Sequence, residues 1–404
     1  GGLLTTSCDD MLDKGNDYVI YSDGRVLYNP ADTATSVMGI LNKLQAIAVR
    51  TNLFGELRGD LVVTRSNATI DLKDIAEFNV GDDNRYNNPR DYYAIINNCN
   101  FFLERADSTA GNVNRNEKYF EAEIAQVHSI RAWTYLQLAK VYGRVPLVTE
   151  PVLTKLQSEA TYPMLDLGQI CDYFIDDLKP YYAKEYPGYV SIGGDIDPQL
   201  CFFPSQVVMG DMLLWKAAIA QNKDIAKQAA KCYYDYIIWD LGGKTPLTTG
   251  EGRNSWSATS LEEERYNSRQ TVYQSVGGNW GAKNNTTISA IPMDSASSCG
   301  FYNELRNFYN TTYKTTKYEE ASIEPSQSLK DLSAAQTYID YNTKKEVTTV
   351  NTAKFTEEQL EKGYQGDLRY SANFSTSTGK YNNQEVEYQS NYKHDGQHIG
   401  IYRA

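Results

Sequence analysis

The stretch YFEAEIAQVHSIRAWTYLQLAKVYGRVP, residues 119–146, decides the fold of this chain. Within it, a small residue followed three positions later by a larger ring recurs every seven residues: Ala125 and His128, Ala132 and Tyr135, Ala139 and Tyr142. This spacing predicts one long helix with alanines and rings on a single face. Gly143 and Pro146 then end it. Because such a helix cannot bury its stripe alone, it needs helical partners on both sides, as in helical-repeat proteins.

Further helices are predicted on both sides of this stretch. Apolar residues at helical spacing indicate helices over 33–51, 89–107, 166–179, 204–220 and 223–239, and a shorter one over 71–78. Two of the pairs are joined by short polar turns and therefore predict antiparallel helix hairpins, the unit of a tetratricopeptide-like repeat. We expect a mainly α scaffold over residues 31–240.

Residues 241–404 have a different character. They are rich in Thr, Ser, Asn, Gly and Tyr, and helical periodicity survives only over 301–313 and 356–362. Short strands are predicted over 271–276 and 286–290. A large irregular region on a helical scaffold is typical of a binding surface.

Composition excludes some classes of protein. The 404 residues carry a net charge of −12, and an acidic surface repels phosphate backbones, which argues against a nucleic-acid partner. No apolar run reaches the roughly 18 residues of a membrane-spanning helix. The six cysteines form no CxxC pair, which argues against a zinc or redox centre. Cys99, Cys171 and Cys232 fall in helical patterns and are expected to pack as small apolar groups.

The first eight residues, GGLLTTSC, are similar to the end of a bacterial lipobox. They predict acylation of Cys8, with residues 1–8 as the signal-peptide remnant and 9–30 as a polar tether. Several acyl chains on one cysteine anchor a chain stably, at about 0.8 kcal/mol per buried CH₂. The alternative is a cysteine that lies near the terminus by chance.

Groups for catalysis are scarce. Of three histidines, His128 falls on the packing face of the long helix and is expected to be buried and hydrogen-bonded, and His394 and His398 flank a glycine in a segment that does not resemble a helix. The adjacent acids at 176–177, 262–264 and 319–320 are interpreted as solvated charge, because neighbours on a helix diverge by about 100°. No phosphate loop, dinucleotide fingerprint or nucleophile elbow occurs. We predict no catalytic residue, metal or cofactor.

Aromatic and polar residues in the irregular regions remain as candidates for binding. Rings stack on the C–H face of a sugar, and amides and arginine bond its hydroxyls. The candidate ligand residues are Arg58, Tyr86, Asn88, Trp256, Tyr273, Trp280 and Tyr302. For each tryptophan the alternative is that it caps a small core within its own loop.

The run RAxxYxxLxxxYGxVPL from Arg131 to Leu147 resembles the signature helix of the SusD-like (RagB/SusD) family, the outer-membrane nutrient-binding lipoproteins of Bacteroidetes. Four further segments resemble the family in the same order: CDDMLD at 8–13, NNCNFFL at 97–103, DYFIDDL at 172–178 and the hairpin at 204–239. Residues 398–403 are similar to the entry to the family's last repeat, which implies that the C-terminal part is missing from this sequence.

The resemblance implies a SusD-like bundle of tetratricopeptide-like hairpins with a large irregular insertion. It implies a surface-exposed lipoprotein, anchored by lipid in the outer membrane, that hands oligosaccharides to a SusC-like TonB-dependent transporter and is not an enzyme. Family members also capture peptides, which is the first alternative for this chain. A glycoside hydrolase using two distant carboxylates and a cytosolic repeat scaffold are alternatives from other classes.

Overall fold

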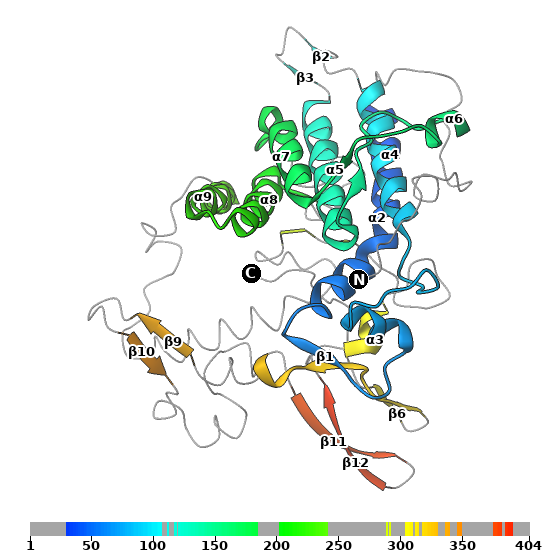
Figure 1. Cartoon of the computed structure of the whole chain (residues 1–404), viewed down its shortest axis with the longest axis vertical. Helices are drawn as coiled ribbons and strands as arrows, with labels where there is room; N and C mark the ends of the chain where they lie inside the picture. The colour runs from blue at the N-terminus through cyan, green and yellow to red at the C-terminus, as the bar shows by residue number, and fades with distance from the viewer. Residues whose placement is uncertain are drawn as a thin grey trace. The chain divides into compact units, whose positions relative to one another are not determined.

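The computed structural model (Figure 1) describes residues 30–106, 111–112, 117–118, 120–184, 202–240, 288–289, 291, 304–309, 312–314, 317–329, 336–339, 346–349, 375–381 and 384–390. The chain forms two compact units, which we describe separately. The helical unit comprises residues 1–48, 88–253 and 288–292, and the mixed unit comprises 49–87, 254–287 and 293–404. The mixed unit thus includes residues 49–87 from within the predicted scaffold of 31–240. None of the described helices has the length and apolarity that crossing a membrane requires.

Helix α5 (Glu121–Tyr142) is the centre of the helical unit. It lies between α4 (Pro89–Arg105) and α7 (Leu167–Leu178), and it also contacts α8 (Ser205–Ala220) (Figure 1). Every residue from 124 to 139 is buried. The prediction that one face of this helix is buried is therefore too narrow. Neighbouring elements pack on more than one side of α5 and bury its polar positions as well. The predicted end is confirmed, since Gly143 adopts a left-handed φ of 76° and its N–H donates to the Ala139 carbonyl oxygen.

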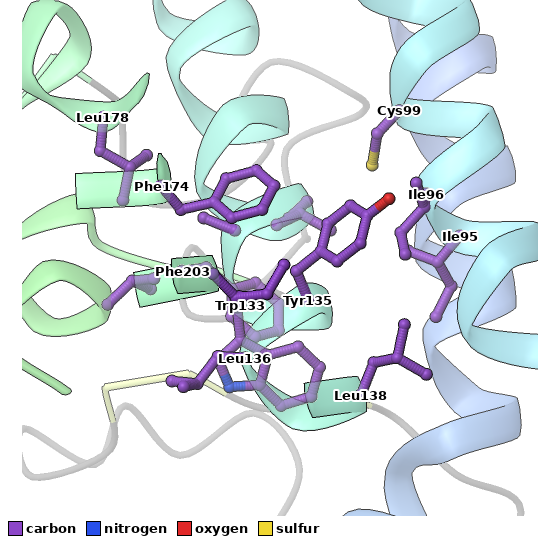
Figure 2. Close-up of a cluster of buried hydrophobic side chains, with 14 of the residues drawn as sticks. Ile95, Ile96, Cys99, Trp133, Tyr135, Leu136, Leu138, Phe174, Leu178 and Phe203 are labelled. Atoms are coloured by element: carbon purple, nitrogen blue, oxygen red, sulfur yellow. The ribbon is translucent and has the colours of Figure 1, made fainter. Parts of the chain in front are cut away.

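The core of this unit is built around Tyr135 (Figure 2). Its ring lies between Ile96 and Cys99 of α4 on one side and Phe174 of α7 on the other. The Phe174 ring stacks on it at 4.9 Å between centroids. The Tyr135 hydroxyl donates to the Val148 carbonyl oxygen at 3.0 Å and accepts from the Val148 N–H at 2.7 Å. Burying such a side chain contributes roughly 1.5–3 kcal/mol, and the two hydrogen bonds satisfy its polar end.

The predicted second hairpin is confirmed as α8 and α9 (Lys223–Asp240), two helices in extensive contact. The chain reverses at Gln221, whose φ of 51° is left-handed. The Asn222 side-chain oxygen then accepts from the N–H of Asp224 at 2.9 Å and begins α9. Gly210 in α8 lets the Tyr233 ring of α9 approach closely, since a β-carbon there would lie 2.7 Å from a ring carbon.

Helix α7 begins with a capping box. The Asp166 carboxylate accepts from the Gln169 N–H at 2.9 Å, and the Gln169 side-chain oxygen accepts from the Asp166 N–H at 3.0 Å. A second capping box, of Thr154 and Gln157, begins the short α6 (Lys155–Ser158). A 3₁₀ turn (Lys179–Tyr181) follows α7. Two antiparallel strand pairs complete this part: β4 (Val145–Pro146) with β5 (Met164–Leu165), and β2 (Gly111–Asn112) with β3 (Glu117–Lys118).

The mixed unit contains the C-terminal part of α2 (Pro30–Glu56), together with α3 (Ile70–Ala76) and α11 (Leu305–Tyr309). Strand β1 (Val62–Thr64) pairs antiparallel with β8 (Ile323–Pro325), so segments some 260 residues apart in the chain lie side by side. Apolar residues of all these elements are buried, among them Leu53, Leu72, Ile75, Leu305 and Ile323. Three further antiparallel pairs are β6 (Thr312–Lys314) with β7 (Lys317–Glu319), β9 (Gln336–Ile339) with β10 (Glu346–Thr349), and β11 (Ser375–Tyr381) with β12 (Gln384–Ser390).

Most predicted helices of the scaffold are confirmed, with ends shifted by a few residues. The predicted helix over 301–313 is wrong in length, because α11 covers only Leu305–Tyr309 and Thr312 begins a strand. Within the predicted strand at 286–290, residues 288–289 are described and are not in a strand. The predicted strand at 271–276 and helix at 356–362 lie outside the described residues.

Candidate ligand-binding site

The structure describes three of the predicted ligand residues. Arg58 and Tyr86 lie in the mixed unit, and Asn88 lies at the start of α4 in the helical unit. The structure therefore does not show the three as one site. Four predicted ligand residues and the predicted lipidation site lie outside the described residues: Trp256, Tyr273, Trp280, Tyr302 and Cys8.

Tyr86 is held in a polar cluster rather than presented as a flat surface. It is only 5% exposed, and its hydroxyl donates to the Glu304 carboxylate at 2.6 Å. The Arg85 guanidinium lies 4.6 Å from the centre of the Tyr86 ring and pairs with the same carboxylate. Burial and the hydrogen bond to Glu304 raise the pKa of Tyr86, so its hydroxyl stays protonated.

The exposed member of this cluster is Arg85, whose side chain is 54% exposed. Arg85 is not among the predicted ligand residues, because a charged residue beside a tyrosine has no distinctive pattern in the sequence. The guanidinium group of Arg85 carries five N–H donors. Its hydrogen bonds to Glu304 and Tyr86 use fewer than five of these donors. Arg85 is therefore positioned to donate to a polar ligand, with Tyr86 beneath it as support.

Arg58 lies between two aromatic rings. Its guanidinium carbon is 4.8 Å from the centre of the Phe54 ring and 5.1 Å from that of Phe78. Phe54 is buried at 6% exposure, whereas Phe78 is 68% exposed. The cation–π contacts orient the planar guanidinium. Arg58 is a predicted ligand residue but neither ring is, although Phe78 is an isolated aromatic residue in the polar segment EFNVGDD.

Arg65 connects two distant segments of the same unit. It forms ion pairs with Glu320 at 3.3 Å and Glu324 at 3.4 Å. The backbone N–H of Arg65 also donates to the Ser322 carbonyl oxygen at 2.8 Å, and the Asn67 amide donates to the Glu320 carbonyl oxygen at 3.1 Å. These contacts hold the 65–67 loop next to β8. The interpretation of Glu320 as solvated charge is therefore wrong, because its carboxylate pairs with Arg65.

Asn88 has a local role in the structure. It is the residue before α4, and its amide donates to the Asp91 carboxylate at 3.2 Å in the first turn of that helix. A contact with a ligand at Asn88 stays a prediction.

The prediction of solvated acids at 176–177 is wrong for Asp177. Its carboxylate lies 2.8 Å from Nδ1 of His128 and 3.1 Å from the Arg131 guanidinium, and the Asp177 side chain is 16% exposed. Asp176, one residue earlier, is exposed and pairs with Lys179 at 2.6 Å. The two neighbouring acids thus differ in exposure and have different partners.

His128 is buried and hydrogen-bonded, as predicted. The Tyr181 ring stacks on it at 4.0 Å, and Arg131 donates to the Asn100 side-chain oxygen at 3.0 Å. Burial lowers the pKa of the His128 imidazole, and the hydrogen bond to Asp177 offsets this only in part. Burial alone would raise the pKa of the Asp177 carboxyl, but His128 and Arg131 outweigh it and hold that pKa below its usual value. The network joins α5 to α4 and α7 and is structural.

The three cysteines expected in the core are confirmed as buried free thiols: Cys99, Cys171 and Cys232. Within the part of the chain that the structure describes, no three His, Cys, Asp or Glu side chains gather as they would around a metal ion.

Comparison with known proteins agrees with the helical fold described above. The chain is 32% identical over 133 residues to SusD-like protein P2 of Formosa agariphila, a match that covers 32% of this chain and 25% of that protein. A solved SusD superfamily structure from Bacteroides thetaiotaomicron matches 75% of this chain and 62% of its own length at 19% identity, with a TM-score of 0.50. Another from Bacteroides vulgatus matches 91% of this chain and 68% of its own length at 14% identity, with a TM-score of 0.51. No protein-family model matches the chain.

A mainly helical fold with helix hairpins is therefore confirmed, and it is the fold of SusD superfamily structures. Together with the sequence match over 133 residues, this likeness in fold makes the chain similar to SusD-like proteins. The matched segment spans about a quarter of the curated relative.

Proposed function

We propose that this protein is a cell-surface glycan-binding lipoprotein that captures oligosaccharides and delivers them to a SusC-like TonB-dependent transporter in the outer membrane. The observation that carries the proposal is the SusD-like fold, which the sequence match to a SusD-like protein supports. The family's known role as nutrient-binding lipoproteins supplies the function.

The side chains of the mixed unit suit a neutral sugar. Arg85 offers exposed N–H donors, and Arg58 with Phe78 offers an aromatic surface beside a cation. Sugars are bound by donors to their hydroxyls and by rings against their C–H faces. A peptide ligand remains the alternative, because the same groups bind peptide carbonyls and apolar side chains.

Binding without catalysis is the second part of the proposal. Two of the acids that the sequence places side by side have partners: Asp177 pairs with His128 and Arg131, and Glu320 pairs with Arg65. A glycoside hydrolase needs two carboxyl groups facing one bond at roughly 5–10 Å. Asp176 is paired with Lys179 and Asp177 is held by His128 and Arg131, which argues against a shared substrate.

Binding is tested by electrophoresis of the purified full chain in native gels that contain one polysaccharide each: amylopectin, laminarin, xylan or galactomannan. We expect retardation by at least one of them, and no release of reducing sugar on prolonged incubation. Retardation by none, with binding to a peptide mixture, would replace the glycan by a peptide. Release of reducing sugar would refute a role without catalysis.

Anchoring through Cys8 is tested in cells given labelled palmitate. We expect label in the parent and none in Cys8→Ala, and surface protease accessibility in the parent only. Label that persists in Cys8→Ala would remove Cys8 as the anchor.

Delivery is tested by affinity purification of the tagged protein from detergent-solubilised outer membranes. A TonB-dependent transporter recovered in stoichiometric amount supports it, and recovery without one contradicts it.

A further inference from the structure

Phe78 adopts a backbone conformation that phenylalanine rarely takes. Its φ is +56°, in the left-handed region. It follows the C-cap of α3: its N–H donates to the Ile75 carbonyl oxygen at 3.2 Å, and the N–H of Asn79 donates to the Asp74 carbonyl oxygen at 2.8 Å. These two bonds form a Schellman motif, in which the position of Phe78 is usually glycine. A residue with a β-carbon is strained there, and a bulky one more so.

Burial does not compensate for this strain. Phe78 is 68% exposed, so its ring gains little from the hydrophobic effect. The other non-glycine residues with positive φ in the described part of the chain are Ala183 and Gln221, one small and one polar. Phe78 is thus the large apolar residue among them. Strained residues cluster at active sites, ligand-contacting positions and switch regions.

The Phe78 ring is supported from below. The Arg58 guanidinium lies over it at 5.1 Å and also over the buried Phe54 ring at 4.8 Å. Phe54 is part of α2, so the stack fixes the exposed ring to a helix of the mixed unit. Arg58 covers one face of the Phe78 ring, and the rest of the ring accounts for its exposed surface. The result is an exposed aromatic surface whose orientation is restrained by the contact with Arg58.

We propose that Phe78, supported by Arg58, is the residue on which a sugar ring of the ligand stacks. The pyranose C–H face is apolar and nearly flat and matches an exposed phenyl ring, while its hydroxyls point outward to polar neighbours. Glu77 and Asn79, both exposed, flank Phe78 in the chain and carry such groups. The inference rests on the proposed function, because it names one contact of that same glycan site.

The test compares Phe78→Gly with Ile70→Ala in the full chain. Glycine removes the ring and also relieves the strain, so loss of folding cannot explain a loss of binding. Ile70 is the matched control, since it is equally exposed at 68% and begins the same helix α3. The probe is whichever of amylopectin, laminarin, xylan and galactomannan retards the parent.

We expect Phe78→Gly to bind that polysaccharide at least tenfold more weakly, with a thermal midpoint equal to or above that of the parent. Ile70→Ala should bind within twofold of the parent, and Phe78→Trp should retain binding because it keeps an aromatic face. Unchanged affinity in Phe78→Gly would overturn the inference and leave the proposed function standing. An equal loss in Ile70→Ala would also overturn it, as nonspecific apolar adhesion. A parent that binds none of the four refutes the glycan function itself and this inference with it.

Discussion

Replacing Asp177 by asparagine removes one charge from the network in the helical unit and leaves the shape of the side chain. Arg131 then remains as a cation with only 5% of its side chain exposed and with its carboxylate partner gone. Breaking a buried pair by removing one partner costs about 3–5 kcal/mol, because the remaining charge stays buried without its partner. Asparagine keeps one acceptor oxygen, and Asp177 is 16% exposed, so we expect the lower end, about 3 kcal/mol.

The assay is urea unfolding followed by circular dichroism at the helical signal, which reports mainly on the helical unit. With an m-value of about 3 kcal/mol per molar, a loss of 3 kcal/mol lowers the unfolding midpoint by about 1 M. The matched control is Asp176→Asn. Its carboxylate is exposed and pairs with Lys179, and exposed pairs contribute little, so its midpoint should equal that of the parent.

A double-mutant cycle separates the pair from its surroundings. Arg131→Met combined with Asp177→Asn removes both charges, and the combined loss should fall below the sum of the two single losses by about 2 kcal/mol. Equal midpoints for Asp176→Asn and Asp177→Asn would refute the reasoning, because they would show that the burial of Asp177 has no energetic consequence. Strict additivity in the cycle would refute the direct coupling of Asp177 with Arg131.

Three further predictions follow from other contacts. The helical unit should lose stability as the pH falls below about 6.5. In that range His128 binds a proton in the unfolded chain but not in the folded protein, where its pKa is lowered. Urea unfolding midpoints measured at pH 7.5 and 5.5 test this, and equal midpoints would contradict it. Gly210→Ala should lower stability by about 1–3 kcal/mol in the same assay, since the new β-carbon would meet the Tyr233 ring at 2.7 Å. Tyr86→Phe should lower thermal stability by about 1.5 kcal/mol through loss of its hydrogen bond to Glu304, and an unchanged midpoint would mean that the bond contributes nothing.

Local patterns were enough to predict the helices of the scaffold. The end of α5 at Gly143 and the turn before α9 follow from residues within one or two turns of each other, and both are present. The buried histidine and the three buried cysteines were also predictable, because each falls at a core-facing position of a helical pattern.

The candidate site was predictable only in part. Arg58 was selected for its place in an irregular, polar region, but the two rings that hold it were not, since Phe54 belongs to a helix and Phe78 to a loop. Tyr86 was selected as an aromatic surface, and the structure shows it nearly buried against Glu304, more than 200 residues away. No short-range pattern contains that contact.

The order of residues along the chain by itself determined which segments of the scaffold are helices, to within a few residues at their ends, because capping residues, glycines and apolar spacing act within a few residues of one another. Tertiary structure alone decided that α5 is buried along residues 124–139, that Asp177 is held in a network while Asp176 meets solvent, and that Phe78 is exposed above Arg58. Those outcomes depend on partners that are close in space and distant in the chain. His128 and Asp177 are 49 positions apart, and Arg65 and Glu320 are 255 apart.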